Sequence, residues 1–172
     1  AIPAAYGGGG QGITEASIVL EEVAASGACM NGASSIHLSI FGMHPVVRHG
    51  SEELRQRYLP RVAAGDLHVA FGVTEPDAGL DTTAIRTHAV ADGAGYRVTG
   101  RKVWTSKALE SERVLLLTRT TPVGECAKRT DGLTLFVAPL HDPAVTVRPI
   151  PKLGRNAVAS CTTLACCERS ST

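Results

Sequence analysis

The sequence is poor in several features that would place a protein in a special class. Only 4% of its 172 residues are aromatic, 19% are charged, and the formal net charge is +1. This balance gives no basic surface for nucleic acid or for an anionic membrane. No apolar run approaches the ~20 residues that a membrane-spanning helix needs, and the first residues lack the basic segment and apolar core of a signal peptide. We therefore expect neither nucleic acid nor a membrane as a partner.

Cysteines are few and unevenly placed. The five are Cys29, Cys126, Cys161, Cys166 and Cys167. Their number is odd and they form no C-x-x-C pair, so a disulfide framework or a zinc site is not expected, and a reducing cytoplasm is the expected location. The three histidines between residues 37 and 49 lie seven and five residues apart. These spacings do not match the i, i+4 pair of a helical metal site, and we interpret the histidines as surface or partly packed residues.

Apolar residues are plentiful, at 44%, and their spacing changes once along the chain. Up to about residue 64 they recur at helical spacing, and from Leu67 they alternate. Helices are expected at residues 14–26, 31–43, 45–49 and 51–64. Strands are expected at residues 68–74, 85–91, 96–99, 102–106, 113–119, 133–139 and 144–150. Helices followed by strands predict an α+β fold, in which a partial helical domain (residues 1–66) precedes a small antiparallel β-barrel or sandwich domain (residues 67–160).

Residues at the ends of these segments support the boundaries. Thr14 and Ser51 suit the N-caps of helices, and Gly27 and Gly65 suit helix ends. Pro60 lacks a backbone donor, so the last helix is expected to kink or restart beside it. Residues 92–95 read Asp-Gly-Ala-Gly and predict a hairpin turn between the second and third strands.

Two short segments carry most of the chemical information. Residues 71–81 read FGVTEPDAGLD and residues 100–106 read GRKVWTS, each beside an apolar, strand-like run. Both place hydroxyls and backbone N–H groups beside glycine, which suits a flat, phosphorylated cofactor. Each segment also has a purely structural interpretation. The first is a common turn, Trp104 is a core anchor, and Arg101 and Lys102 are solvated residues at a strand edge.

Together the two segments resemble a known family. The pattern TEPxAGxD beginning at Thr74 is similar to the first signature of the acyl-CoA dehydrogenases, and GxKxWxS beginning at Gly100 is similar to the flavin-contacting strand that follows it. Their separation also matches, and the resemblance extends from about Ile2 to about Ser160. It implies FAD as the cofactor, an acyl-CoA as the substrate, electron-transfer flavoprotein as the electron acceptor, and a homo-oligomer for the full-length protein.

The resemblance also implies which residues contact the cofactor. Phe71, Val73 and Thr74 would line the flavin, Trp104 would pack against its ring, and the Ser106 hydroxyl would bond the ring edge. The complete expected set is Phe71, Val73, Thr74, Gly79, Leu80, Trp104, Thr105 and Ser106. Leu80 departs from the family, because many members have a serine here whose hydroxyl contacts the flavin phosphate or the substrate thioester region.

No residue of the sequence matches the family's catalytic base. That base is a glutamate on a helix of the C-terminal domain, and it removes a proton α to the thioester carbonyl while hydride passes from the β carbon to the flavin. Glu75 is a signature residue and not this base. Residues 161–172 read CTTLACCERSST and leave the family pattern, which predicts a truncated or frame-shifted, frayed end.

The sequence thus favours a fragment of an FAD-dependent acyl-CoA dehydrogenase that is inactive alone. The alternatives are a non-catalytic flavin-binding or structural remnant of the fold, and a flavin oxidase or monooxygenase built on the same fold.

Overall fold

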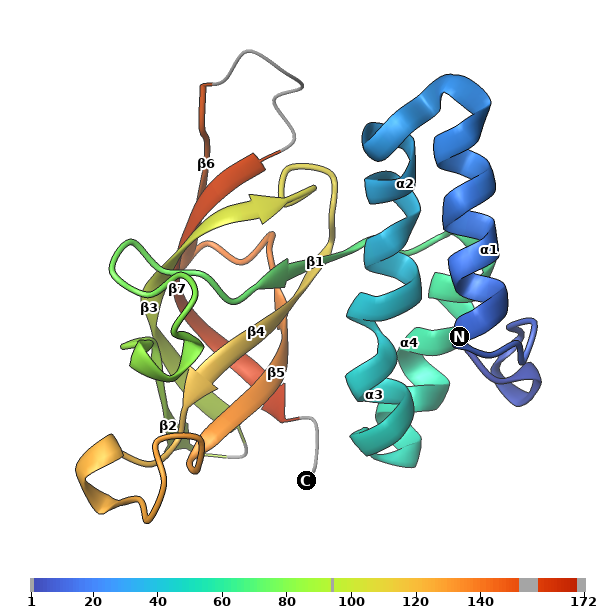
Figure 1. Cartoon of the computed structure of the whole chain (residues 1–172). Coiled ribbons are helices and arrows are strands. Elements are labelled where there is room, and N and C mark those ends of the chain that lie inside the picture. The colour runs from blue at the N-terminus through green and yellow to red at the C-terminus, as the bar shows by residue number, and fades with distance from the viewer. Residues whose placement is uncertain (1, 94, 152–157, 170–172) are drawn as a thin grey trace. The chain divides into compact units, whose positions relative to one another are not determined.

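The chain divides into two compact units, Ala1–Val69 and Ala70–Ser170. The structure is a computed structural model that describes residues 2–93, 95–151 and 158–169. Helices α1 to α4 belong to the first unit and strands β2 to β7 to the second, while β1 begins at the border between them (Figure 1). The expected order of helices and then strands is confirmed. Among the described residues between Ile85 and Pro151, the one helical element is a 3-10 turn at Val123–Glu125.

The helical unit is built from four α-helices. They are α1 (Ile13–Val23), α2 (Cys29–His37), α3 (His44–His49) and α4 (Glu52–Ala64). Ser51 caps α4 as expected, because its Oγ accepts a hydrogen bond from the Leu54 amide at 3.2 Å. Gly65 ends α4 in the left-handed region with φ 84°. The structure differs from expectation at Pro60, since α4 runs through this residue without interruption.

The start and end of α1 also depend on small residues. Its N-cap is Gly12, two residues before the expected Thr14, and the Glu15 carboxylate accepts a hydrogen bond from the Gly12 amide at 2.8 Å. A π-helical turn (Ala24–Ala28) follows α1, and within it Gly27 has φ 91°. A side chain would be strained at such a φ, so glycine fits the break between α1 and α2.

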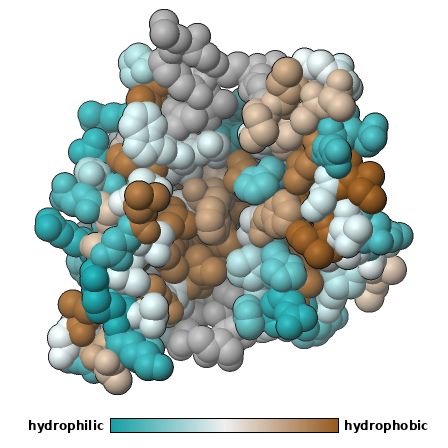
Figure 2. All heavy atoms as spheres, in the orientation of Figure 1, coloured by the Kyte–Doolittle hydropathy of each residue, from teal (hydrophilic) through white to brown (hydrophobic). Residues whose placement is uncertain are grey.

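The helical unit buries its apolar residues unevenly. Helix α4 buries Leu54, Tyr58, Leu59 and Val62. Helices α1 and α2, by contrast, bury only alanines among their described side chains, and Ile18 of α1 is 52% exposed. Apolar side chains reach the surface of both units on the face drawn in Figure 2.

The β unit contains one sheet of seven strands among the described residues. They are β1 (Val69–Gly72), β2 (His88–Asp92), β3 (Gly95–Ser106), β4 (Arg113–Arg119), β5 (Leu133–Pro139), β6 (Val145–Pro149) and β7 (Val158–Arg169). The strand order is β1-β4-β2-β3-β7-β5, with β6 beside β7 and β5 also paired with β4. The expected hairpin is present, with Asp92 opposite Gly95.

The expectation of an antiparallel barrel needs correction. The sheet is mixed, because β2 and β4 run parallel. They join through one residue pair, and β5 joins β7 through only two. The sheet therefore curls back on itself, but these two strand pairings are so short that it is not a continuous closed barrel. Most pairings are antiparallel, and the β4–β5 ladder spans seven residue pairs.

Two strands differ from the expected segments. The segments 96–99 and 102–106 are one strand, β3, which continues through Gly100. Residues 161–169, expected to be a frayed tail, belong to β7, which pairs with β3, β5 and β6. Strand β7 was not predicted, because its polar and cysteine-rich composition hides the alternation of a strand. Residues 170–172 lie outside the described residues.

An apolar cluster lies inside the β unit. Its buried members are Ala70, Ala89, Val98, Ala108, Val114, Leu116, Phe136, Ala138 and Leu140. The Phe136 ring packs against Tyr96 with 4.9 Å between ring centroids. This core fixes β3, β4 and β5, and so provides a rigid support for the loops that leave β1 and β3.

Candidate cofactor-binding site

The two segments identified in the sequence lie side by side in the structure. We call residues 73–81, which follow β1, the signature loop. The Thr74 carbonyl accepts a hydrogen bond from the Val103 amide at 2.9 Å, and the Val73 carbonyl accepts one from the Lys102 ammonium at 2.9 Å. Two consecutive carbonyls of the signature loop are therefore held by two consecutive residues of β3.

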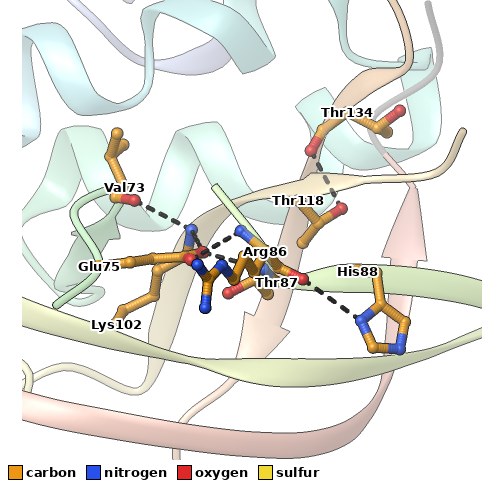
Figure 3. Close-up of polar contacts among 8 residues, drawn as sticks. All are labelled: Val73, Glu75, Arg86, Thr87, His88, Lys102, Thr118 and Thr134. Atoms are coloured by element: carbon orange, nitrogen blue, oxygen red, sulfur yellow. Dashed lines mark hydrogen bonds and ion pairs between the residues drawn. The ribbon is translucent and has the colours of Figure 1, made fainter. Parts of the chain in front are cut away.

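A buried ion pair joins the same two segments. Lys102 Nζ lies 2.8 Å from Glu75 Oε1, and the residues are 1% and 7% exposed. Figure 3 shows the Lys102 nitrogen between the Val73 carbonyl and the Glu75 carboxylate. The expectation of a solvated Lys102 is therefore wrong. Alternation along β3 turns this residue toward the core, where the aliphatic chain packs and the ammonium finds two acceptors.

The Glu75 carboxylate is fully engaged in hydrogen bonds. Besides Lys102, it accepts the amides of Arg86 at 2.7 Å and Thr87 at 3.0 Å. These bonds tie the signature loop to the chain that leads into β2. A carboxylate that accepts three donors is a poor proton acceptor, so the geometry agrees with the interpretation that Glu75 is not a general base.

The surroundings of the pair shift the pKa values of both groups. Burial by itself raises the pKa of Glu75, but the hydrogen bonds from the Arg86 amide, from Lys102 and from Thr87 outweigh it, so the pKa lies below its ordinary value. For Lys102, burial lowers the pKa, and the bond and attraction to Glu75 offset part of that shift.

A β-bulge shapes the last part of β3. Lys102 pairs with Cys161 of β7 and Thr105 pairs with Ala159, so Val103 and Trp104 together oppose a single residue of β7. This two-to-one count defines a bulge, which bends a strand and re-aims its side chains. The Val103 amide, freed from the ladder, bonds the signature loop instead. Trp104 has φ 58°, a region that bulky residues rarely adopt.

The bulge decides which of the expected residues reach solvent. Trp104 is 61% exposed, so its interpretation as a core anchor is wrong. Ser106 is exposed on the same side of β3, whereas Thr105 is 1% exposed and faces the core. The Thr105 side chain therefore points away from the exposed side on which Trp104 and Ser106 lie. Among the described residues the Thr105 Oγ1 has no hydrogen-bond partner.

The remaining expected residues lie on or before the signature loop. Phe71 of β1 is 38% exposed, and Leu80 is fully exposed. Val73 and Thr74 are half-buried, and Gly79 is exposed. Hydrogen bonds hold Val73 and Thr74 against β3, but among the described residues none joins Gly79 or Leu80 to Trp104 or Ser106.

The segment just after the signature loop is held by an arginine that the sequence did not single out. Arg119, 7% exposed at the end of β4, donates to the carbonyls of Thr83, Arg129 and Asp131. Asp81 also accepts from Arg129 at 2.8 Å. Arg119, Glu75 and Lys102 were missed as supporting residues because their partners lie 10 to 36 positions away in the chain. The alternation of β3 was the one available signal for Lys102.

A hollow of about 380 Å³ opens elsewhere on the β unit and contains none of the expected residues. It is lined by Ala108, Leu109, Leu140, His141, Asp142, Pro143, Val145 and Val147. The candidate site is instead an open protein wall: an exposed tryptophan and hydroxyl on β3 beside the signature loop. In the described part of the chain, histidines, cysteines and carboxylates form no metal-binding group, and none of the described helices has the length and apolarity to cross a membrane.

Family models match both units. The N-terminal domain of the acyl-CoA dehydrogenases matches residues 1–66, and their middle domain matches residues 70–165. Acyl-CoA dehydrogenase FadE26 of Mycobacterium tuberculosis is 38% identical over 149 residues, which are 86% of this chain and 36% of FadE26. The chain thus spans little more than a third of the length of this relative.

Solved structures show the same likeness. A glutaryl-CoA dehydrogenase from Mycobacterium smegmatis in complex with FADH2 superposes with a TM-score of 0.81 at 27% identity, over 96% of this chain and 41% of that one. The ChsE4-ChsE5 complex from Mycobacterium tuberculosis gives a TM-score of 0.79 at 30% identity, over 99% of this chain and 43% of that one. With both of its units matched in order, the chain belongs to the acyl-CoA dehydrogenase family.

Proposed function

We propose that the β unit supplies one wall of the FAD site of an acyl-CoA dehydrogenase. The observation that carries this proposal is Trp104, held 61% exposed on a bulge that is hydrogen-bonded to the signature loop. Exposing the only tryptophan at a left-handed φ costs stability in two ways. Such a cost is understandable where the ring serves as a platform for a ligand.

The residues present fit an isoalloxazine ring. Trp104 offers an apolar face, and Ser106, two residues along the same strand face, offers a hydroxyl for the ring edge. Val73 and Thr74 are half-buried beside β3, and Phe71 is partly exposed before them. Gly79 leaves space for the close approach of a phosphate, since an added Cβ would meet nothing within 4 Å.

The proposed reaction is α,β-dehydrogenation of an acyl-CoA thioester. When bound, FAD would take up the hydride from the β carbon. The residues of this chain would bind and orient the flavin and exclude water from one side of it. Glu75 would remain ionised and would not carry a proton. The electron acceptor we propose for the whole protein is electron-transfer flavoprotein, and we propose a cytoplasmic homo-oligomer.

Titration of the 172-residue chain with FAD tests the proposal. We expect binding that is much weaker than in relatives of full length, because buried contact area is smaller. Flavin should quench the fluorescence of Trp104, and Trp104→Ala should weaken binding further. Val90→Ala, which removes another exposed apolar side chain of the β unit, is the matched control and should bind as the parent does. Equal binding by the parent and Trp104→Ala would contradict the proposal.

Acyl-CoA dehydrogenation by the 172-residue chain alone can be tested separately from FAD binding. We expect no dehydrogenation of acyl-CoA by the chain alone, because loss of a general base typically costs about 10²–10⁴-fold and substrate positioning is lost with it. Anaerobic mixing of FAD-loaded protein with acyl-CoAs of several chain lengths, followed by flavin absorbance, measures this. Bleaching at a catalytic rate would reveal a base among these residues.

A further inference from the structure

The buried Glu75–Lys102 pair has a position that stability alone does not explain. A buried ion pair is seldom better for stability than apolar residues of similar volume, since two charges must be desolvated. Four other ion pairs, Arg55–Glu52, Arg86–Asp77, Arg97–Asp92 and Arg129–Asp81, each include at least one side chain that is more than half exposed. The buried Glu75–Lys102 pair lies where the signature loop meets the bulge of β3.

The contacts of the pair converge on this junction. The Lys102 ammonium bonds the Val73 carbonyl and Glu75, so it reaches two points of the signature loop. The next residue, Val103, bonds the Thr74 carbonyl through its backbone, and Trp104 follows at once. Gly72 lets β1 lie close to β4, because an added Cβ would lie 3.0 Å from Leu116 Cδ1 and 3.2 Å from Val114 Cγ2. The backbone of the signature loop is thereby held against the backbone of β3 at consecutive residues.

We propose that the Glu75–Lys102 pair is a positioning device for Trp104. It fixes the signature loop against the bulge, and the bulge holds Trp104 outward. The pair itself does not contact the cofactor. Its effect on FAD rests on the function proposed above, whereas its effect on Trp104 stands without any cofactor. The device selects the residue that faces solvent, because in a regular strand Trp104, two residues after the buried Lys102, would face the core as Lys102 does.

The test uses a double variant of the full chain, Glu75→Gln with Lys102→Met. This change removes both charges together, so no uncompensated ion is left buried, and the methionine keeps most of the apolar stem. Arg97→Met is the matched control, because it breaks an exposed ion pair on the same strand. Circular dichroism in the far ultraviolet establishes that each protein is folded.

Trp104 is the only tryptophan, so its near-ultraviolet circular dichroism and fluorescence anisotropy report on this side chain directly. In the folded double variant, without FAD, we expect loss of the Trp104 dichroism and a fall in anisotropy, with Arg97→Met like the parent. A pair with a merely structural role would lower stability and leave the signals of the folded protein unchanged. That result would overturn the proposal.

Titration with FAD forms the second arm. Misplacement of a binding group by about 1 Å can cost up to about 10²-fold, and we expect the dissociation constant of the double variant to rise about tenfold or more. A parent protein that binds no FAD would refute the proposed function, while the Trp104 signals would still decide the role of the pair. If the double variant is unfolded, Lys102→Arg takes its place. It keeps the charge but moves the donors, and an unchanged Trp104 signal would overturn the proposal.

Discussion

The two units of this chain bury different kinds of side chain. Every buried polar or charged side chain among the described residues lies in the β unit, including Glu75, Lys102 and Arg119. The helical unit buries apolar side chains only, mostly in α4. Burial of a polar group is costly unless its bonds are satisfied. Here Glu75 and Lys102 hold the signature loop, and Arg119 bonds the Thr83 carbonyl just beyond it. The difference shows that the β unit, not the helical unit, is built to hold loops in a defined position.

The largest expected effect lies in the core of the β unit. Phe136 is fully buried and contacts Tyr96. We expect Phe136→Ala to lower the free energy of unfolding by about 3–5 kcal/mol, because the lost transfer free energy is added to the cost of a cavity. Urea denaturation followed by Trp104 fluorescence, which reports the β unit, measures this change. A loss below about 1 kcal/mol would show that this cluster is loosely packed.

Acid should destabilise the β unit through Glu75. The folded-state pKa of Glu75 lies below its ordinary value, so its contribution to stability is present above the unfolded-state pKa of about 4.3 and is lost as pH falls through the folded pKa. Protonation also leaves the Lys102 ammonium buried without its counter-charge. Glu75→Gln should flatten this part of the stability–pH curve. Asp81 and Glu52 have lowered pKa values as well, so an equal slope in the variant would assign the effect to them.

A smaller effect is expected at the N-cap of α4. Ser51→Ala removes the acceptor of the Leu54 amide, and such a change typically costs about 0.5–2 kcal/mol. Far-ultraviolet dichroism during urea denaturation follows the helices. Ser51→Asp, which keeps an acceptor at the cap, is the control and should restore stability. An equal loss in both variants would place the effect outside the cap.

The smallest effect is expected on the surface of α1. Ile18 is 52% exposed, and surface substitutions away from special features usually change stability by within about 0.5 kcal/mol. Ile18→Ser should therefore leave the unfolding curve almost unchanged, while the solubility of the protein rises. A loss above about 2 kcal/mol would mean that this face is covered in solution, and it would remove the contrast between the two units.

Much of the fold followed from local patterns in the sequence. The change of hydrophobic period at Leu67 separated helices from strands, and residues 113–119 and 133–139 matched β4 and β5 to the residue. The hairpin at Asp92 and the caps at Ser51 and Gly65 depend on a few neighbouring residues. Such features are decided by backbone geometry and side-chain type over one or two turns, so the sequence expresses them directly.

The sequence by itself determined the family signature and the alternation of β3, but only the tertiary structure decided which side chains face the core. Lys102 is buried because Glu75, 27 residues away, and the Val73 carbonyl supply its acceptors. Trp104 is exposed because the register between β3 and β7 shifts by one residue at the bulge. The composition of β7 concealed this partner strand. A bulge shifts the phase of every side chain beyond it, and its position depends on the partner strand and on the loop that takes up the freed amide.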